Sequence, residues 1–280
     1  MPSKIIDGKK IADKILNDLK SKIKNLKEKP GLALVLVGNN PASEIYVNFK
    51  EKTCKEIGFY CERFNLDENI SEMDLLNLVN DLNQKSNING ILVQLPLPKH
   101  ISENLITNSI LPHKDVDGFT AVNLGHLFSE KTILAPATAR AVLHLIESTG
   151  IKIEGKNAVV VGRSNIVGKP VAMMLLDKNA TVIICHSKTK NLAEHTKKAD
   201  ILVVAVGKPK LIKQDIVKEG AVVIDVGINR VDGKIIGDVD FENVKEVAGY
   251  ITPVPGGVGP MTIAMLLDNT LKAMELAKRI

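Results

Sequence analysis

The segment from Asn157 to Pro170, which reads NAVVVGRSNIVGKP, constrains the fold most strongly. Its run of β-branched residues, Val159 to Val161, is typical of a buried parallel strand, and a glycine-bearing turn and a new apolar period follow it. A dinucleotide-binding βα unit begins in this way. Gly162 can form the sharp exit from the strand. Gly168 can let the next helix pack close to the sheet, with its free N–H groups facing an anion.

The match to the usual dinucleotide fingerprint is imperfect. That fingerprint places glycines at relative positions one, three and six. Here the glycines fall at positions one and seven, and Ser164 stands at position three, where a phosphate could approach. An ordinary strand-to-helix turn is therefore the alternative interpretation of this segment.

The end of the next expected strand, Ala180 to Cys185, indicates which cofactor the unit takes. NAD-binding units place an acidic residue about 20 positions after the first glycine, where it binds the ribose hydroxyls. The strand is followed instead by His186, Ser187 and Lys188, and Arg163 directly follows the first glycine. A guanidinium, a hydroxyl and an imidazole suit a 2′-phosphate, which a carboxylate would repel. The sequence predicts NADP, although Arg163 by itself could be an ordinary solvent-exposed cation.

Length and composition bound the class of protein. With 280 residues, 45% hydrophobic and 25% charged, the chain is typical of a soluble globular protein, and we expect two domains. The net charge of +5 is dispersed and aromatic residues make up only 3%, so nothing supports nucleic-acid binding.

The cysteines and the apolar runs indicate the compartment. Cys54, Cys61 and Cys185 share no metal or redox spacing, so we expect core thiols in a reducing compartment and no metal site. No apolar run reaches the roughly 18 residues of a membrane span, and the amino terminus shows no long apolar stretch of the kind that secretory leaders carry, so we expect neither membrane spanning nor secretion. We therefore expect a cytoplasmic protein that has no membrane partner.

Hydrophobic periodicity and helix-end signals predict an α/β chain throughout. A four-residue apolar step predicts a helical stripe within Ile5 to Leu26. Asn40 is expected as an N-cap, Pro41 as the first helical residue and Gly58 as the stop. The other elements expected in the first half are strands Gly31 to Gly38, Tyr60 to Leu66 and Ile91 to Leu95, with a helix from Ser71 to Gln84. This βαβαβ order predicts a parallel sheet.

The second half repeats the alternation and predicts a second α/β domain. The elements expected there are a helix from Thr138 to Ser148, strands Ile201 to Val206 and Ala221 to Val226 with a short helix before each, and a final helix from Pro260 to Ala277. We expect a first domain over residues 1–137, onto which the last helix, about 266–280, folds back. A Rossmann-like domain is expected over 138–265.

A few side chains in the first half could carry chemistry. Tyr46 and Lys50 are four apart on one expected helix and so share a face. Gln94 ends an expected strand, and Asp115 and Asp117 lie in a glycine-terminated loop. Each has an ordinary structural explanation when taken alone, but together they could converge on one site.

Six strings, in order, resemble one known family. They are VGNNPASEIYVNFKEKTCKEIGF, VQLPLPKH, KDVDGF, VVVGRSNIVGKP, TVIICHSKT and ITPVPGGVGPMT. The chain is similar over nearly its whole length to the bifunctional methylenetetrahydrofolate dehydrogenase/methenyltetrahydrofolate cyclohydrolase family. The resemblance implies a homodimer of two-domain α/β subunits, each with its active site in the cleft between domains. It also implies a place in one-carbon metabolism, serving purine, histidine and methionine biosynthesis.

The family carries out two reactions on tetrahydrofolate one-carbon derivatives. Methylenetetrahydrofolate gives a hydride to NADP, and water opens the resulting methenyl cation to 10-formyltetrahydrofolate. The resemblance implies that Lys50 is the catalytic lysine of the hydrolytic step, that Tyr46 and Gln94 position it and the folate, and that Asp117 anchors the pterin. Further substrate positions implied are Val93, Leu95, Pro255, Gly256, Gly257, Val258 and Gly259. The implied NADP positions are Gly162, Arg163, Ser164, Ser187, Ile228 and Thr138.

One stretch departs from the family pattern P-C-T-P-x-G. Residues Pro136 to Ala141 read PATARA, so Thr138 is kept while Ala137, Ala139 and Ala141 replace the cysteine, the second proline and the glycine. The change removes a preset helix start and adds a methyl group where backbones could pack. It puts the local cofactor contact and domain closure in doubt more than the chemistry.

Two alternatives stay open at this point. A monofunctional methylenetetrahydrofolate dehydrogenase would need no catalytic lysine, so Lys50 argues against it. A non-catalytic NADP-binding protein would need the cofactor turn but not the folate residues.

Overall fold

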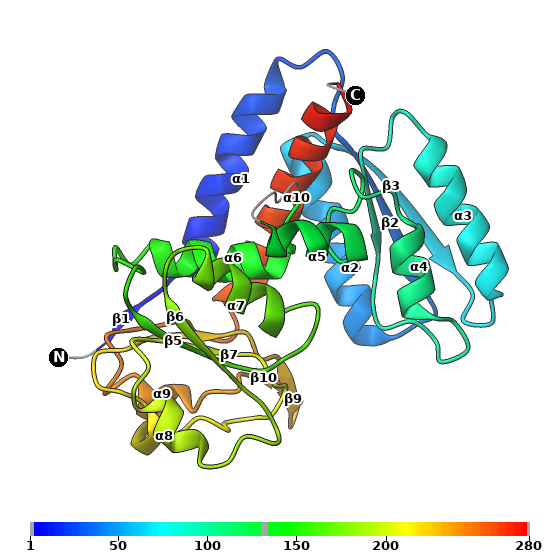
Figure 1. The fold of residues 1–280 in the computed structure, drawn as a ribbon. Coiled ribbons are helices and arrows are strands. Elements are labelled where there is room, and N and C mark those ends of the chain that lie inside the picture. Colours follow the sequence, from blue (N-terminus) through cyan, green and yellow to red (C-terminus); the bar gives the residue numbers. More distant parts are fainter. Residues whose placement is uncertain (1–2, 130–133, 279–280) are drawn as a thin grey trace. The chain divides into compact units, whose positions relative to one another are not determined.

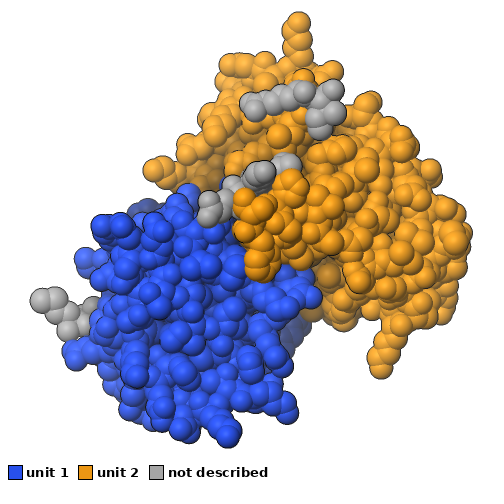
Figure 2. Space-filling view, in the orientation of Figure 1, with its two compact units in different colours: residues 1–13, 138–262 blue, residues 14–137, 263–280 orange. Residues whose placement is uncertain are grey.

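A computed structural model describes residues 3–129 and 134–278 of the chain (Figure 1). The chain divides into two compact units, shown in separate colours in Figure 2. Unit 1 comprises residues 1–13 and 138–262, and unit 2 comprises residues 14–137 and 263–280. Two long helices contribute residues to both units, α1 (Gly8–Lys24) and α10 (Val258–Ala277).

Unit 2 is built on a three-stranded parallel sheet in the order β3-β2-β4. Its elements are β2 (Gly31–Val37), α2 (Pro41–Ile57), β3 (Tyr60–Leu66), α3 (Glu72–Gln84), β4 (Gly90–Val93), α4 (Glu103–Ser109) and α5 (Ala121–Phe128). Helix α2 lies on one face of the sheet and helices α3 and α4 on the other (Figure 1). The expected βαβαβ order is confirmed, although α4 and α5 were not predicted.

The ends of α2 form as the sequence predicts. The Asn40 side-chain oxygen accepts from the backbone N–H groups of Ala42 and Ser43, and Pro41 is the first helical residue. Gly58 closes the helix in the left-handed conformation with φ 93°. These local signals fix where α2 starts and stops, and hence which of its residues face the sheet.

Unit 1 contains a six-stranded sheet in the order β1-β11-β8-β7-β5-β6, and all of its pairings are parallel. Its strands are β1 (Lys4–Ile5), β5 (Asn157–Val161), β6 (Thr181–Cys185), β7 (Ile201–Val204), β8 (Val222–Asp225) and β11 (Tyr250–Ile251), with a separate hairpin of β9 (Asn229–Val231) and β10 (Lys234–Ile236). Its helices are α6 (Ala137–Glu147), which starts at the unit boundary, α7 (Gly168–Leu176), α8 (Leu192–Thr196), α9 (Phe241–Val244) and the short 3-10 helix Gln214–Ile216. Helices α6 and α7 lie on one face of the sheet and α8 and α9 on the other (Figure 1). This is the expected doubly wound dinucleotide-binding architecture.

The amino-terminal residues lie in unit 1, whereas the sequence-based boundary placed them in the first domain. Strand β1 pairs in parallel with β11, in register Lys4 to Tyr250 and Ile5 to Ile251. The backbone N–H of Ile6 also donates to the carbonyl oxygen of Ile251 at 2.8 Å. A two-residue strand carries too little periodicity to be recognised from sequence, which is why only the helix that follows it was expected.

Each sheet buries a hydrophobic core. The core of unit 2 includes Val35, Leu75, Val79 and Ile106, and that of unit 1 includes Val159, Leu202 and Val223. The three cysteines are free thiols, of which Cys61 is only half-buried. Within the described residues no helix is long and apolar enough to cross a membrane, and no three His, Cys, Asp or Glu side chains cluster as a metal site requires.

Candidate active site

The structure brings Lys50, Gln94 and Asp117 together at the carboxyl edge of the unit 2 sheet. Lys50 comes from α2, and its Nζ donates to Oε1 of Gln94 at 3.0 Å. Gln94 directly follows β4 and extends its pairing, since its backbone N–H donates to the carbonyl oxygen of Val35 at 2.8 Å. The charges of Lys50 and Asp117 act on each other's pKa. Three residues far apart in sequence therefore form one polar cluster.

Burial sets the protonation of this cluster. It lowers the pKa of the Lys50 ammonium, and the negative charge of Asp117 opposes that effect only in part. Burial raises the pKa of Asp117 to about 6, which the Lys50 charge opposes and the Asp115 charge reinforces. Both residues are thus shifted toward their neutral forms. An amine whose pKa is lowered, next to a carboxyl group whose pKa is raised to about 6, is the kind of pair that acid–base chemistry uses.

The loop that carries Asp117 is fixed by residues on either side of it. The buried Asp115 carboxylate accepts from the backbone N–H groups of Gly118 at 2.9 Å and Thr120 at 2.8 Å. Asn269 of α10 donates its amide to the carbonyl oxygens of Val116 and Ala135, at 2.8 and 2.9 Å. Asp115 therefore has a structural role, holding the loop that carries Asp117, and Asn269 was not identified from the sequence.

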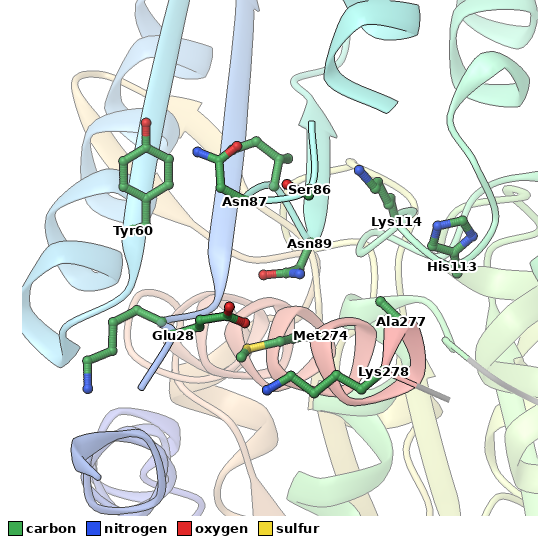
Figure 3. A pocket seen from close by; sticks show the side chains of 12 residues that line it. Glu28, Tyr60, Ser86, Asn87, Asn89, His113, Lys114, Met274, Ala277 and Lys278 are labelled. Carbon is green, nitrogen blue, oxygen red and sulfur yellow. The ribbon is translucent and has the colours of Figure 1, made fainter. Parts of the chain in front are cut away.

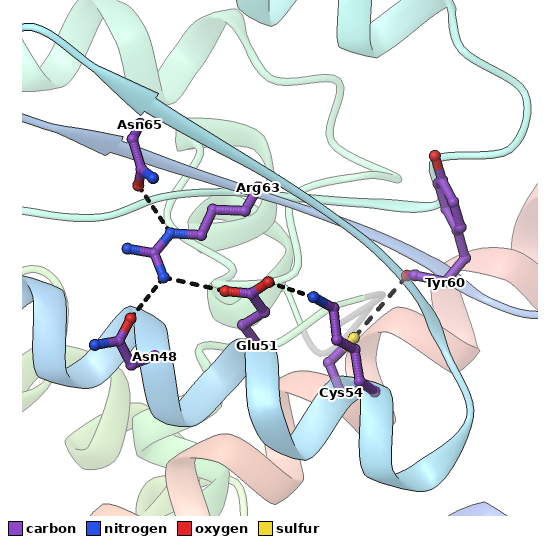
Figure 4. A network of polar contacts seen from close by, with 7 residues as sticks. Asn48, Glu51, Cys54, Tyr60, Arg63 and Asn65 are labelled. Carbon is purple, nitrogen blue, oxygen red and sulfur yellow. Dashed lines mark hydrogen bonds and ion pairs between the residues drawn. The ribbon is translucent and has the colours of Figure 1, made fainter.

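A second polar network ties α2 to the edge strand β3 (Figure 4). Arg63 of β3 donates to the side-chain oxygens of Asn48 and Glu51, which lie on either side of Lys50 in the helix. Its Nε donates to Oδ1 of Asn65 at 2.8 Å. The Arg63 and Glu51 side chains are only 18% and 22% exposed, so this pair restrains α2 more firmly than an exposed ion pair would. Arg63 was not identified from the sequence.

The other expected folate residues of unit 2 lie near the same edge. Val93 is buried at the end of β4, and Leu95 is half-buried one residue beyond Gln94. Tyr46 is half-buried one turn before Lys50 on α2. Their positions fit the implied roles, which remain predictions.

The cofactor turn of unit 1 has the close approaches that its two glycines predict. Gly162 has φ 133°, and a Cβ atom placed there would lie 2.3 Å from the carbonyl oxygen of Ala205. A Cβ atom at Gly168 would lie 2.2 Å from the carbonyl oxygen of Gly162. Side chains at either position would push the turn away from its neighbours.

The expectation that the start of α7 offers free N–H groups to an anion is wrong for its N-cap residue, Val167, and for its first two residues. The Ser164 Oγ accepts from the backbone N–H groups of Val167 at 3.1 Å and Gly168 at 3.3 Å. The next amide, that of Lys169, donates to the Ser164 carbonyl oxygen at 3.1 Å. Ser164, at the third fingerprint position, thus accepts the hydrogen bonds of the N–H groups that begin the helix. Its hydroxyl hydrogen remains available for donation to a ligand.

Three of the remaining expected NADP residues follow the carboxyl ends of strands of the unit 1 sheet. Arg163 and Ser187 are exposed after β5 and β6, and Ile228 is 45% exposed after β8. Thr138 is half-buried at the second position of α6. Ligands of doubly wound sheets bind at this edge.

The expected substrate loop Pro255 to Gly259 ends inside α10, whose first residue is Val258. Pro255 is exposed, while Gly257 and Val258 are buried. The carbonyl oxygen of Gly256 accepts from the backbone N–H of Lys9 at 3.0 Å, so part of this loop is engaged within unit 1. Fewer backbone groups are therefore free for a ligand than the glycine content indicates.

A cavity of about 560 Å³ lies elsewhere in unit 2, at the amino ends of the strands (Figure 3). Tyr60, Asn89 and Lys114 are among the residues that line it. The Lys114 ammonium donates to the carbonyl oxygens of Leu82, Asn83 and Lys85, so it caps the end of α3. The cavity is at the opposite edge from Lys50 and does not contain the candidate residues.

Comparison with known proteins identifies the family. The catalytic-domain model of the tetrahydrofolate dehydrogenase/cyclohydrolase family matches residues 6–117, and the NAD(P)-binding-domain model of the same family matches residues 136–278. The chain belongs to this family. It is 57% identical to the bifunctional protein FolD of Halothermothrix orenii over 277 residues, which covers 97% of this chain and 98% of the relative.

Solved structures of the family agree with the fold. The bifunctional FolD of Campylobacter jejuni is 50% identical and superposes with a TM-score of 0.95 over 99% of this chain and 100% of that one. The FolD of Trypanosoma brucei, solved with NADP cofactor and an inhibitor, is 37% identical with a TM-score of 0.96 over all of both chains. The family named from the six sequence motifs is confirmed.

The PATARA stretch folds without the proline and glycine that the family commonly has there. Helix α6 starts at Ala137, and both Ala139 and Ala141 are fully buried. Their methyl groups are accommodated within the packed interior, and alanine is the best intrinsic helix former. The departure therefore does not prevent the helix from starting.

Proposed function

We propose that this protein is a bifunctional one-carbon folate enzyme. It oxidises 5,10-methylenetetrahydrofolate to the methenyl form with NADP and hydrolyses that product to 10-formyltetrahydrofolate. The observation that carries the proposal is the Lys50–Gln94–Asp117 cluster, present in a chain of this family. We assign the folate to residues of unit 2 and the cofactor to residues of unit 1.

Lys50 is the base of the hydrolytic step. An ordinary lysine is protonated at neutral pH and cannot accept a proton, but burial lowers the pKa of Lys50. The cationic methenyl substrate lowers this pKa further, because two positive charges repel. The neutral amine donates one N–H to Gln94 and keeps its lone pair free for a proton of the attacking water. Such assistance is typically worth about 10²–10⁴-fold in rate.

Asp117 anchors the pterin. An ionised carboxylate accepts two hydrogen bonds from the amino-pyrimidine edge, and the tethers from Asp115 and Asn269 hold its loop in place. Tyr46, Val93 and Leu95 complete the folate contacts. The dehydrogenase step requires the donor carbon to be aligned with the hydride acceptor that NADP supplies when bound.

The residues of unit 1 fit a cofactor that carries a 2′-phosphate. Arg163 and Ser187 are exposed at the carboxyl edge of the sheet, and no carboxylate lies among His186 to Lys190. A guanidinium and a hydroxyl there attract a phosphate. Gly162, Ser164, Ile228 and Thr138 are the other cofactor positions that we propose.

An assay of the purified protein tests this function. Supplied with methylenetetrahydrofolate and NADP, it should reduce the cofactor and release 10-formyltetrahydrofolate. Failure to reduce either NADP or NAD would reject the enzyme assignment. Accumulation of the methenyl compound without its hydrolysis would show that the protein is a dehydrogenase without cyclohydrolase activity.

The family resemblance and the cysteine spacing support two further assignments. We infer a homodimer, which light scattering of the purified protein tests directly. We also infer a cytoplasmic location, which the absence of a disulfide-type cysteine pattern favours. Fractionation of cells expressing the tagged protein checks this location.

A further inference from the structure

Two buried aspartates, neither of them among the expected cofactor residues, lie at the carboxyl edge of the unit 1 sheet. Asp225 is the last residue of β8 and is 2% exposed, and Asp238 follows the β9–β10 hairpin and is 0% exposed. Burying a carboxylate is costly unless it is hydrogen-bonded. The hydrogen-bond partners of Asp225 and Asp238 therefore indicate the role of each carboxylate.

Asp238 binds the loop that follows β7. Its Oδ2 accepts from the backbone N–H groups of Val206 at 2.7 Å and Gly207 at 2.9 Å. Its Oδ1 accepts from the backbone N–H of Lys208 at 2.8 Å and from Nδ2 of Asn229 at 2.9 Å. One carboxylate thus fixes three successive amides and a side chain that lies next to Ile228.

Asp225 holds Asp238 in place. Its Oδ1 accepts from the backbone N–H groups of Gly227 at 2.9 Å and Asp238 at 3.0 Å, and its Oδ2 accepts from that of Val239 at 2.8 Å. The glycines beside the pair leave room for the carboxylates. A Cβ atom at Gly227 would lie 2.1 Å from Cγ of Asp238, and one at Gly237 would lie 1.9 Å from Oδ2 of Asp225.

The segments that the pair joins are neighbours of the cofactor turn. Strands β8, β7 and β5 are adjacent in the sheet, so the loops after them lie side by side. The loop after β7 begins at Ala205, whose carbonyl oxygen is the atom nearest to a Cβ placed on Gly162. The loop after β8 carries Ile228. A change in either loop would therefore reach the surface that receives the cofactor.

We infer that Asp238, held by Asp225, is a positioning residue for cofactor binding. It fixes the loops after β7 and β8 in the shape that NADP requires, and it acts through those loops. The inference rests on the proposed function, because that function assigns the cofactor to this edge.

The variant Asp238→Asn tests the inference. An asparagine offers one oxygen to four donors and turns its own N–H groups toward them, so at least two donors lose their partner. Charge-assisted hydrogen bonds of this kind are each worth about tenfold or more in an equilibrium, so the Kd for NADP should rise about tenfold to a hundredfold. Hydrolysis of supplied methenyltetrahydrofolate without NADP should change less than about twofold, since it needs no hydride acceptor.

Asp200→Asn is the matched control. Asp200 also accepts a backbone N–H, that of Asn157 at 2.9 Å, but it directly precedes β7 and so lies at the opposite edge of the same sheet. Its loss should lower the melting temperature and leave the Kd for NADP unchanged. Equal weakening of NADP binding by both variants would show that Asp238 merely stabilises the unit and would overturn the inference.

A milder variant covers the case in which Asp238→Asn does not fold. Asn229→Ala removes one contact to the Asp238 carboxylate and should raise the Kd for NADP about threefold or more. Wild-type affinity in either folded variant would overturn the inference. Failure of the wild-type protein to bind NADP would instead refute the proposed function, so the two failures are distinguishable.

Discussion

The Nζ atom of Lys50 lies 3.0 Å from Oε1 of Gln94, which joins the middle of helix α2 to the residue that follows strand β4. The amide oxygen can only accept, so it takes one N–H of the lysine and leaves the rest of the amine to a ligand. Because an amide carries no net charge, it orients Lys50 without placing a second negative charge beside the ammonium. Gln94 therefore orients the Lys50 amine, while burial and Asp117 act on its pKa.

Lys50→Met should abolish the cyclohydrolase and spare much of the dehydrogenase. The variant keeps most of the side-chain volume but removes the base, so hydrolysis of methenyltetrahydrofolate should fall about 10²–10⁴-fold. Lys52→Met is the control, since Lys52 lies on the same helix with its side chain 70% exposed. Separate assays of the two steps check the result. Equal loss of both activities in Lys50→Met would contradict the role given to the lysine.

Gln94→Glu should shift the pH dependence of hydrolysis to higher pH. A carboxylate in place of the amide oxygen would add a negative charge beside Lys50 and so raise the pKa of its ammonium. The rise of the cyclohydrolase rate with pH should then begin at a higher pH than in the wild type. Rate profiles over pH measure this shift. An unshifted profile would show that Lys50 does not titrate in the hydrolytic step.

The sequence was sufficient for the architecture wherever local signals were strong. Asn40, Pro41 and Gly58 predict both ends of α2, and β3 forms over the expected residues Tyr60 to Leu66. The β9–β10 hairpin was missed although its signal was present. Asp232 and Gly233, both with positive φ, form the Asp-Gly turn that favours a tight hairpin.

The sequence indicated the candidate residues of the site, but it did not indicate the hydrogen bonds that hold the surrounding loops and helices in place. Lys50, Gln94 and Asp117 could be chosen because they match motifs in order along the chain. The roles of Arg63, Asn269 and Asp238 depend on hydrogen bonds that cross 15, 153 and 32 residues of sequence. No periodicity or spacing encodes such long-range partners, so only the folded structure reveals them.

Asp117 should give the folate reaction an acidic limb near pH 6. Burial raises the pKa of this carboxyl group to about 6, so the group is protonated below that pH and ionised above it. Only the ionised form accepts two hydrogen bonds from the pterin, so kcat/KM should fall as the pH drops through about 6. Asp117→Asn cannot ionise and should bind folate weakly with no limb there. A limb that persists in the variant would assign the titration to another group.

Arg163→Ala should weaken the binding of NADP far more than that of NAD. A charge-assisted contact to a phosphate contributes about 1.5–3 kcal/mol, which corresponds to roughly ten- to a hundredfold in Kd. NAD lacks the 2′-phosphate and should lose little. Lys152→Ala is the control, because this exposed cation precedes β5 at the other edge of the sheet. An unchanged ratio of the two affinities would show that the phosphate binds elsewhere.

Gly162→Ala should cost more stability than Gly150→Ala, although both glycines have positive φ. At Gly150, with φ 78°, an added Cβ meets no atom within 4 Å, so only the strained backbone opposes alanine. At Gly162 the same methyl group would also lie 2.3 Å from the carbonyl oxygen of Ala205, so β5 and the loop after β7 must separate. That additional clash should cost about 1–3 kcal/mol, as overpacking generally does. Urea unfolding followed by circular dichroism compares the two variants, and equal midpoints would show that the cofactor turn is not held against its neighbour. Because the displaced loop is also the one that Asp238 fixes, Gly162→Ala should weaken NADP binding, while Gly150→Ala should not.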